Sequence, residues 1–363
     1  MDLEGPLTLN PLFNWPTREW ATALPETLGV NGDILCQLDA EAQNIEKLLS
    51  ILVIRSGAIV FEGYYHGGQR DLYHNVNSVT KSVLATLIGI ALEKGYFHSL
   101  DQSLLSFFPE YTPANLDERK QRVTLRHLLT MTSGLQAPSD DTIDHFLEDS
   151  ATIQRLLDLP MRDEPGEVYY YNSVDPHLLT ILLTRVTGMT TAQFARTYLF
   201  DTLGIWCDSQ GNPDPWLQQP SLAGPMHPFG LSDGHLPWAV DVQGYYIGAF
   251  GLRLTTREMA KLGYLYLMRG RWGEQQVLSS AFIEEATSEH TRTPRNDGYG
   301  YYWYRSGFAG YSAECAIGFG GQIIAVLPQL DLVVATTCEP VPGSPTRRLL
   351  EDFIVPACKP ESV

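Results

Sequence analysis

Long apolar runs are missing from this sequence. The longest candidate, residues 83–92, is shorter than the roughly 20 residues that a membrane-spanning helix requires, and it includes Thr86. The amino terminus, Met1 to Pro6, has neither the basic start nor the apolar stretch of a secretory signal. We therefore expect a cytoplasmic protein without a membrane partner.

Basic side chains are scarce as well. The 363 residues include 25 Lys and Arg against 42 Asp and Glu, for a formal net charge of -17 at pH 7. A surface of this sign repels phosphate backbones, so we expect no nucleic acid partner. With 44% hydrophobic and 18% charged residues, the composition excludes disordered and fibrous architectures and predicts a globular protein.

Motifs for metals, cofactors and disulfides are absent too. The nine histidines show no H-E-x-x-H or H-x-H spacing, and there is no C-x-x-C pair, which argues against a zinc site. The chain has no G-x-x-x-x-G-K-[ST] or G-x-G-x-x-G sequence to hold a phosphate. We expect neither a metal nor an organic cofactor. The cysteines are odd in number and widely spaced, which predicts reduced thiols: Cys36, Cys207, Cys315, Cys338 and Cys358.

Strand patterns lie near both ends of the chain, and helical patterns fill the middle. Two β-rich runs, residues 51–54 and 58–61, flank a turn at Ser56-Gly57, which is typical of a hairpin. Apolar residues recur at helical spacing over residues 78–93. Further strands are expected at 301–304, 311–317, 323–327 and 332–336, and further helices at 124–129, 192–199, 256–268 and 346–354.

This order predicts an α+β fold, with an antiparallel sheet flanked by helices and a mainly helical region inserted into it. The sheet domain would be discontinuous and would comprise residues 1–100 and 291–363. The inserted helical domain would span residues 101–290. We expect the functional site in the cleft between the two.

Ser78-Val79-Thr80-Lys81 is the clearest local candidate for chemistry. A serine and a lysine three residues apart lie on one face of a helix. A serine hydroxyl is a weak nucleophile, and an amine activates it only if the pKa of the amine is lowered. Partial burial and the positive end of the helix both act on Lys81 in that direction. The Ser78 amide, at the start of the helix, could also bind a developing oxyanion.

Two alternatives accompany this interpretation. The tetrapeptide also fits a capping serine followed by a surface lysine, although an ammonium group is an awkward choice in an almost wholly apolar helix. Residues 230–234, Gly-Leu-Ser-Asp-Gly, match the G-x-S-x-G nucleophile elbow, which makes Ser232 a rival nucleophile. That elbow requires a strand before it and a helix after it, whereas three prolines surround the segment and favour a loop.

Four motifs in order resemble those of the serine β-lactamase-like hydrolases. They are Ser78-x-x-Lys81, the Val-Thr-Leu-Arg-His-Leu-Leu-Thr-Met-Thr-Ser-Gly-Leu stretch at 123–135, Pro165-Gly166 with Tyr171-x-Ser173, and Gly318-Phe319-Gly320-Gly321-Gln322. This superfamily includes class C β-lactamases, D-alanyl-D-alanine carboxypeptidases, carboxylesterases and nylon-oligomer (aminohexanoate-dimer) hydrolases. The motif pattern is most similar to that of the last branch, and it covers about residues 45 to 340.

The resemblance implies roles for three side chains. Ser78 would be the acylated nucleophile, Lys81 its proton partner, and Tyr171 the tyrosine that relays protons. A phenol becomes a useful base only beside a cation, and Lys81 would supply that charge. Without the resemblance, residues 169–171 would be interpreted as an aromatic strand edge that packs in the core.

The glycine-rich loop departs from the family pattern. In the register adopted here, Ala316-Ile317-Gly318 replaces the usual Lys/His-Thr-Gly, and Phe319 donates the second oxyanion amide beside that of Ser78. A register two residues later, Gly318-Phe319-Gly320, has no cation either. The group that holds the substrate carboxylate in β-lactamases and carboxypeptidases is therefore missing, which favours a neutral or apolar substrate.

Two further residues are candidates for substrate binding. Ser173 replaces the family's Asn, as in the nylon-oligomer hydrolase branch, and offers a shorter side chain to orient a substrate amide. Tyr245 could line the substrate pocket or could simply fill the core between the two domains.

These features predict a serine hydrolase that forms an acyl-enzyme on Ser78 and hydrolyses a small-molecule carboxylic ester or amide, with esters first. One alternative is a β-lactamase, or an acyl transferase of the D-Ala-D-Ala carboxypeptidase or transpeptidase type. Another is a non-catalytic binding protein that retains the fold.

Overall fold

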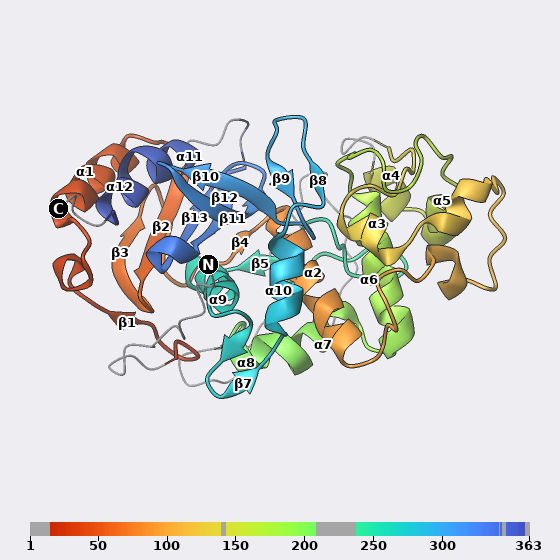
Figure 1. Ribbon diagram of the computed structural model, residues 1–363, viewed down its shortest axis with the longest axis horizontal. Coiled ribbons are helices and arrows are strands. Elements are labelled where there is room, and N and C mark those ends of the chain that lie inside the picture. The colour runs from red at the N-terminus through yellow and green to blue at the C-terminus, as the bar shows by residue number, and fades with distance from the viewer. Residues whose placement is uncertain (1–14, 139–142, 208–236, 341, 343–345, 360–363) are drawn as a thin grey trace, which may run out of the picture.

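Nine strands from both ends of the chain form one sheet (Figure 1). The computed structural model describes residues 15–138, 143–207, 237–340, 342 and 346–359. The strand order is β1-β3-β2-β13-β12-β11-β10-β9-β8, and all neighbours are antiparallel except β1 and β3 at one edge. The strands are β1 (Ala21–Thr22), β2 (Leu48–Arg55), β3 (Ala58–Tyr64), β8 (Thr291–Arg292), β9 (Gly298–Tyr299), β10 (Tyr304–Phe308), β11 (Tyr311–Gly318), β12 (Gln322–Leu327) and β13 (Leu332–Cys338). The α+β fold is confirmed, with one parallel pair added to the antiparallel sheet.

Alternation along the central strands divides the apolar side chains between two cores. In β2, Leu52 and Ile54 belong to one core, whereas Ile51 and Val53 belong to the other, because successive side chains of a strand point to opposite faces. Helices cover both faces of the sheet (Figure 1), so these strands are apolar on both sides. Two short strand pairs lie outside the sheet: β4 (His74–Asn75) with β5 (Arg253–Leu254), and β6 (Arg271–Trp272) with β7 (Gln275–Gln276).

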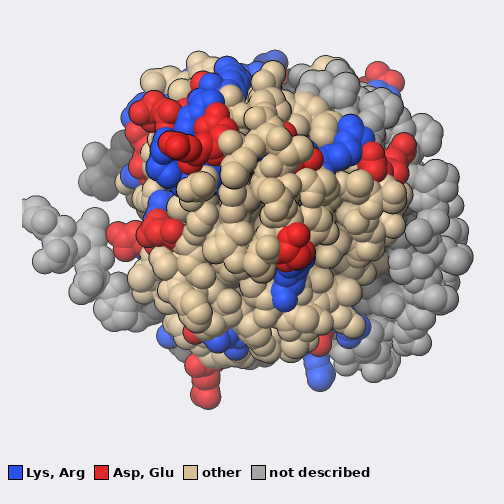
Figure 2. Space-filling view, turned by 90° about the vertical axis from the view of Figure 1, so that its right-hand side faces the viewer, with Lys and Arg blue, Asp and Glu red and all other residues tan. Residues whose placement is uncertain are grey.

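The helices form two groups. The C-terminal helices pack with α1 on one face of the sheet, whereas α9 packs on the other face. The group from α3 to α8 makes up most of the helical region. Figure 2 looks onto the right-hand side of Figure 1; charged side chains are sparse on this face, and basic side chains lie next to acidic ones. The helices are α1 (Gly32–Gln43), α2 (Val79–Glu93), α3 (Leu125–Leu129), α4 (Asp144–Leu147), α5 (Thr152–Leu157), α6 (Val174–Thr187), α7 (Thr191–Ala195), α8 (Asp201–Leu203), α9 (Thr256–Leu267), α10 (Ser280–Thr287), α11 (Thr346–Leu349) and α12 (Val355–Ala357).

Helix α2 lies between the sheet and the helical region. It packs on β11 and β12 on one side and on α6 on another. Every residue from Val79 to Ala91 is buried as a result. The nearly unbroken apolar sequence of this helix is therefore explained by its central position, and the start of the helix lies beside the end of β11.

Most predicted elements are confirmed, but the strand predicted at 301–304 is wrong. Strand β9 ends at Tyr299 and β10 begins at Tyr304. Between them Tyr302 adopts a left-handed backbone with φ of 59°, and the Gly300 amide bonds the Trp303 carbonyl oxygen in a turn. The intervening aromatic side chains are all buried, so this aromatic run marks a tightly packed core segment instead of a strand.

The described residues do not meet the structural requirements of a membrane-spanning helix, a three-ligand metal site or a disulfide. No helix there is both long and apolar enough to cross a bilayer. Nor do His, Cys, Asp and Glu gather, in those same ranges, into a group of three that could hold a metal. The five cysteines are free thiols, and three of them are buried.

Candidate active site

Ser78 lies at the start of α2, where the end of β11 approaches it closely. Ser78 is the N-cap of the helix, and Asn77 before it adopts a left-handed backbone with φ of 48°. Strand β11 ends at Gly318, where an added Cβ would lie 2.4 Å from the Val76 carbonyl oxygen and 3.2 Å from the Ser78 nitrogen. Only glycine permits this approach, which brings the β11–β12 turn next to Ser78.

Lys81 is buried beside Ser78. Its side chain comes from the first turn of α2, one turn beyond Ser78, and the residue is 2% exposed. The Lys81 Nζ donates hydrogen bonds to the Ser78 Oγ at 3.1 Å and to the Ala249 carbonyl oxygen at 2.9 Å. The alternative of a surface lysine is therefore wrong.

Tyr171 reaches the same serine from the segment before α6. The Tyr171 hydroxyl donates to the Ser78 Oγ at 2.7 Å. The Lys81 Nζ lies 4.8 Å from the centroid of the Tyr171 ring, within the range of a cation–π contact. The structure thus places together the three side chains that the resemblance assigned to catalysis, although Tyr171 is 93 residues away from Ser78 in the chain.

The arrangement of these three groups suits nucleophilic catalysis. The Ser78 oxygen accepts one hydrogen bond from an amine and one from a phenol. Before Ser78 attacks a carbonyl carbon, its own proton must pass to one of these groups. The accepting group must then be a neutral amine or a phenolate. Both lie within the distance for direct proton transfer. The site could therefore activate the hydroxyl and later protonate a leaving group.

The turn after β11 is attached to the residue that precedes Ser78. Asn77 supports this turn, because its Nδ2 donates to the Phe319 carbonyl oxygen at 2.9 Å. In the part of the chain that the structure describes, neither the Ser78 amide nor the Phe319 amide donates to a backbone carbonyl oxygen of a turn, loop or cap. Gly320 follows with φ of +84°, a conformation that favours glycine. An oxyanion site formed by Ser78 and Phe319 is consistent with this geometry and stays a prediction.

A buried network holds the Tyr171 segment against α6. The Asn172 Nδ2 donates to the Asp175 Oδ2 at 3.0 Å and to the Tyr170 carbonyl oxygen at 2.9 Å, and the Asp175 amide donates to the Asn172 Oδ1 at 2.8 Å. Burial raises the pKa of the Asp175 carboxyl to about 7, while hydrogen bonds from Asn172 and Ser133 act in the opposite direction. Asp175 lies outside the four motifs, and Asn172 and Ser133 have no assigned role within theirs, so the sequence did not predict this network.

The remaining predicted residues are less clearly part of the site. Ser173 is the N-cap of α6 and is only 4% exposed, so little of its side chain is open to a substrate. Burial raises the pKa of Tyr245, while the charge of Arg185 acts in the opposite direction and that of Asp241 adds to the rise. Substrate binding by either residue stays a prediction. Ser232 lies outside the described residues.

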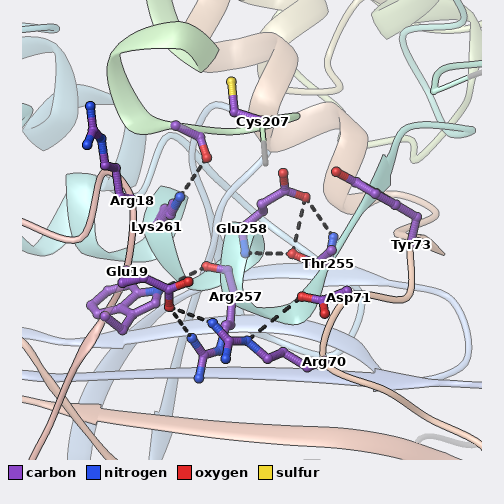
Figure 3. A pocket seen from close by; sticks show the side chains of 12 residues that line it. Arg18, Glu19, Arg70, Asp71, Tyr73, Cys207, Thr255, Arg257, Glu258 and Lys261 are labelled. Atoms are coloured by element: carbon purple, nitrogen blue, oxygen red, sulfur yellow. Dashed lines mark hydrogen bonds and ion pairs between the residues drawn. The ribbon is translucent and has the colours of Figure 1, made fainter. Parts of the chain in front are cut away.

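Away from Ser78, a cavity of about 450 Å³ lies beside the start of α9 (Figure 3). Several of its charged side chains are paired: Glu19 bonds both Arg257 and Arg70, and Arg257 also bonds Glu62 outside the lining. Lys261 donates to two backbone carbonyl oxygens. These contacts attach the segment before β1 to α9. No catalytic candidate lines the cavity, and its paired charges favour a structural role.

Comparisons with known proteins agree with this fold. A solved structure from Bacillus anthracis, described provisionally as a 6-aminohexanoate-dimer hydrolase, is 16% identical, with a TM-score of 0.70 over 96% of this chain and 90% of that one. A family VIII carboxylesterase is 17% identical, with a TM-score of 0.67 over 93% and 98% of the two chains. A Salmonella typhi protein provisionally named a D-alanyl-D-alanine carboxypeptidase is 22% identical over 79% of this chain and 76% of its own length. The profile of the family described as Beta-lactamase matches residues 42–358, and the chain therefore belongs to the beta-lactamase family.

Proposed function

We propose that this protein is a serine hydrolase that forms an acyl-enzyme on Ser78 and hydrolyses a neutral carboxylic ester or amide. The observation that carries the proposal is the pair of hydrogen bonds to the Ser78 Oγ, from Tyr171 at 2.7 Å and from Lys81 at 3.1 Å. Membership of the beta-lactamase family supports it. So does the similarity to solved structures described as a carboxylesterase and, provisionally, as a 6-aminohexanoate-dimer hydrolase.

The proposed reaction has two halves. In the first, the Ser78 Oγ attacks the substrate carbonyl carbon while the serine proton passes to the Lys81 and Tyr171 pair. The amides of Ser78 and Phe319 bind the tetrahedral anion. Its collapse breaks the bond to the alcohol or amine, which leaves with the proton. In the second half, water attacks the acyl-enzyme in the same way and releases the carboxylic acid and free Ser78.

The end of β11 supports a neutral substrate. Ala316, Ile317 and Gly318 offer no cation at the position where the resemblance places the carboxylate-binding group. Phe319, which is 48% exposed, adds an apolar side chain to the turn that Asn77 holds. Esters rank before amides because an alcohol leaving group makes less demand on the acid catalyst than an amine does.

A nucleophile test decides the central claim. The purified protein is assayed with p-nitrophenyl butyrate and is then treated with a fluorophosphonate probe and measured by intact mass. We expect one probe on each chain, attached to Ser78, and loss of both hydrolysis and labelling in Ser78→Ala. Ser232→Ala is the matched control and should keep nearly all of both activities.

Two other outcomes of this test would each favour a different interpretation of the protein. The reverse pattern, with activity lost in Ser232→Ala, would transfer the nucleophile to the G-x-S-x-G segment. If the wild-type protein neither hydrolyses the ester nor reacts with the probe, a non-catalytic binding protein becomes the better interpretation.

The preference for neutral substrates has its own test. p-Nitrophenyl hexanoate and the half-ester p-nitrophenyl hydrogen adipate share a six-carbon acyl chain but differ by one carboxylate. Because the site lacks the usual cation and the chain carries a formal charge of -17, we expect kcat/KM to be several-fold higher for the hexanoate at low salt. Added salt should narrow the difference by screening the repulsion. Faster turnover of the adipate would contradict a neutral substrate without affecting the assignment of Ser78.

A further inference from the structure

A fully buried histidine and aspartate face each other between α6 and the segment before β5. His177, on the first turn of α6, and Asp241, on the segment before β5, both have side chains that are 0% exposed. Their Nε2 and Oδ2 atoms are 3.1 Å apart. Because a carboxylate oxygen only accepts hydrogen bonds, the imidazole N–H is the donor. Placing two such groups in an apolar interior is costly, and the reaction scheme above uses neither of them.

Asp241 organises the segment that contains it, residues 237–252. Its Oδ1 accepts the amides of Gln243 and Tyr245, each at 2.9 Å. Its own backbone amide bonds the Tyr245 carbonyl oxygen at 2.8 Å. Two isolated β-bridges close the segment on itself, Trp238 with Leu252 and Val240 with Tyr246. One carboxylate therefore ties the turn of this segment while its second oxygen bonds α6.

The same segment touches both α6 and Lys81. At Gly248 an added Cβ would lie 2.1 Å from the Pro176 carbonyl oxygen and 2.5 Å from the Thr180 Oγ1, so the backbone lies directly on the turn of α6 that carries His177. The next residue, Ala249, presents its carbonyl oxygen to the Lys81 Nζ at 2.9 Å. The position of this oxygen is thus linked to α6 through Gly248, which directly precedes Ala249, and through Asp241 earlier in the same segment.

We propose that His177 and Asp241 are positioning residues for Lys81. By bonding the segment to α6, they hold the Ala249 carbonyl oxygen where it orients the Lys81 amine toward the Ser78 Oγ. The proposal rests on the function proposed above, because orientation of the amine matters for catalysis only if Ser78 is the nucleophile. Lys81 is 2% exposed, and its hydrogen bond to Ala249 directs the amine within this buried site.

The test compares two amides at position 177. Gln places its amide nitrogen near the position of the His177 Nε2 and keeps a donor to Asp241, whereas Asn is too short to reach it. We expect His177→Asn to lower kcat for p-nitrophenyl butyrate by about 10- to 100-fold, with KM within about two-fold of wild type. The rate of fluorophosphonate labelling should fall in parallel, and His177→Gln should recover most of both.

Tyr266→Phe is the matched control for a purely structural loss. It removes another buried hydrogen bond of the core, between the Tyr266 hydroxyl and the Thr86 Oγ1 at 2.9 Å. We expect it to lower the melting temperature about as much as His177→Asn does, while kcat and the labelling rate stay within about two-fold of wild type. If His177→Asn behaves like this control, or if Gln rescues nothing, the proposal is wrong.

A replacement variant and a structural measurement ensure that the experiment can contradict the proposal. If His177→Asn does not fold, the double variant His177→Leu with Asp241→Asn replaces it, since it keeps the Oδ1 acceptor, buries no unpaired charge and removes the hydrogen bond to α6. Compared with the crystal structure of wild type, that of the variant should show the Lys81 Nζ and the Ala249 carbonyl oxygen separated beyond hydrogen-bond distance. An unchanged contact would overturn the proposal. Because that measurement does not depend on activity, it decides the positioning role even if wild type proves inactive and the proposed function fails.

Discussion

Lys81 and Tyr171 each make their own hydrogen bond to the Ser78 Oγ, so the contribution of each residue to catalysis can be tested by itself. Lys81→Met keeps most of the side-chain volume but removes the amine, and Tyr171→Phe removes only the hydroxyl. Each should lower kcat/KM for p-nitrophenyl esters by about 10²- to 10⁴-fold, the usual contribution of a general acid or base. Steady-state kinetics measure the loss, and circular dichroism checks that the fold is retained.

The chain offers matched controls for both substitutions. Lys120 is also 2% exposed and also donates to backbone carbonyl oxygens, those of Asn115 and Leu157. Tyr170 precedes Tyr171 but directs its hydroxyl to the Ala137 carbonyl oxygen. Lys120→Met and Tyr170→Phe should affect stability and leave kcat/KM within about two-fold of wild type. A comparably small loss in Lys81→Met would mean that Lys81 is a structural residue.

At the residue scale, motifs predicted the side chains of the site but not the backbone around them. Ser78 and Lys81 follow from helical spacing, and Tyr171 follows only from the family resemblance. The Ala249 carbonyl oxygen has no side-chain signature, because any residue type supplies a carbonyl. Asn77 was equally inaccessible, since its role depends on a left-handed backbone and on the position of Phe319, more than 200 residues away.

At the scale of elements, the approach of β11 to α2 depends on a missing side chain. Gly318→Ala would place a Cβ 2.4 Å from the Val76 carbonyl oxygen, so the end of β11 must move away from the start of α2. We expect kcat to fall by at least about ten-fold, because the Phe319 amide follows immediately and a misplaced oxyanion donor costs about that much or more. Ester kinetics and thermal melting check this expectation.

Gly307→Ala is the corresponding control in β10. There the nearest atom to an added Cβ would be the Tyr311 carbonyl oxygen at 3.1 Å, so a small adjustment accommodates the methyl group. This variant should retain nearly wild-type kcat. Equal losses in the two variants would indicate a general weakening of the sheet instead of a local effect at Ser78.

Elements were predicted best where local chemistry and tertiary packing agree. Helix α9 begins where predicted, with a capping box between Thr255 and Glu258. Strands β11, β12 and β13 match their apolar runs to within two residues. The segment at 301–304 was mispredicted because aromatic residues favour both strands and packed cores. The left-handed backbone at Tyr302 arises from tertiary packing, which the pattern does not encode.

At the scale of the whole molecule, Asp175 makes the free energy of unfolding depend on pH. Its pKa rises from 3.8 to about 7 because the folded chain buries it. Between these two values the folded chain holds a proton that the unfolded chain has released. The free energy of unfolding must therefore fall as pH rises through this window, and the contribution levels off above about pH 7.

Asp175→Asn removes this titration while it keeps the shape of the side chain and an oxygen that accepts from Asn172. Between about pH 5 and pH 8, the urea midpoint of the wild-type protein should fall relative to that of the variant, by an amount equivalent to a few kcal/mol at most. Glu258 and Glu314, whose pKa values burial also raises, titrate in both proteins, so the difference isolates Asp175. A constant difference over this range would show that Asp175 ionises in the folded protein as readily as it does in the unfolded chain.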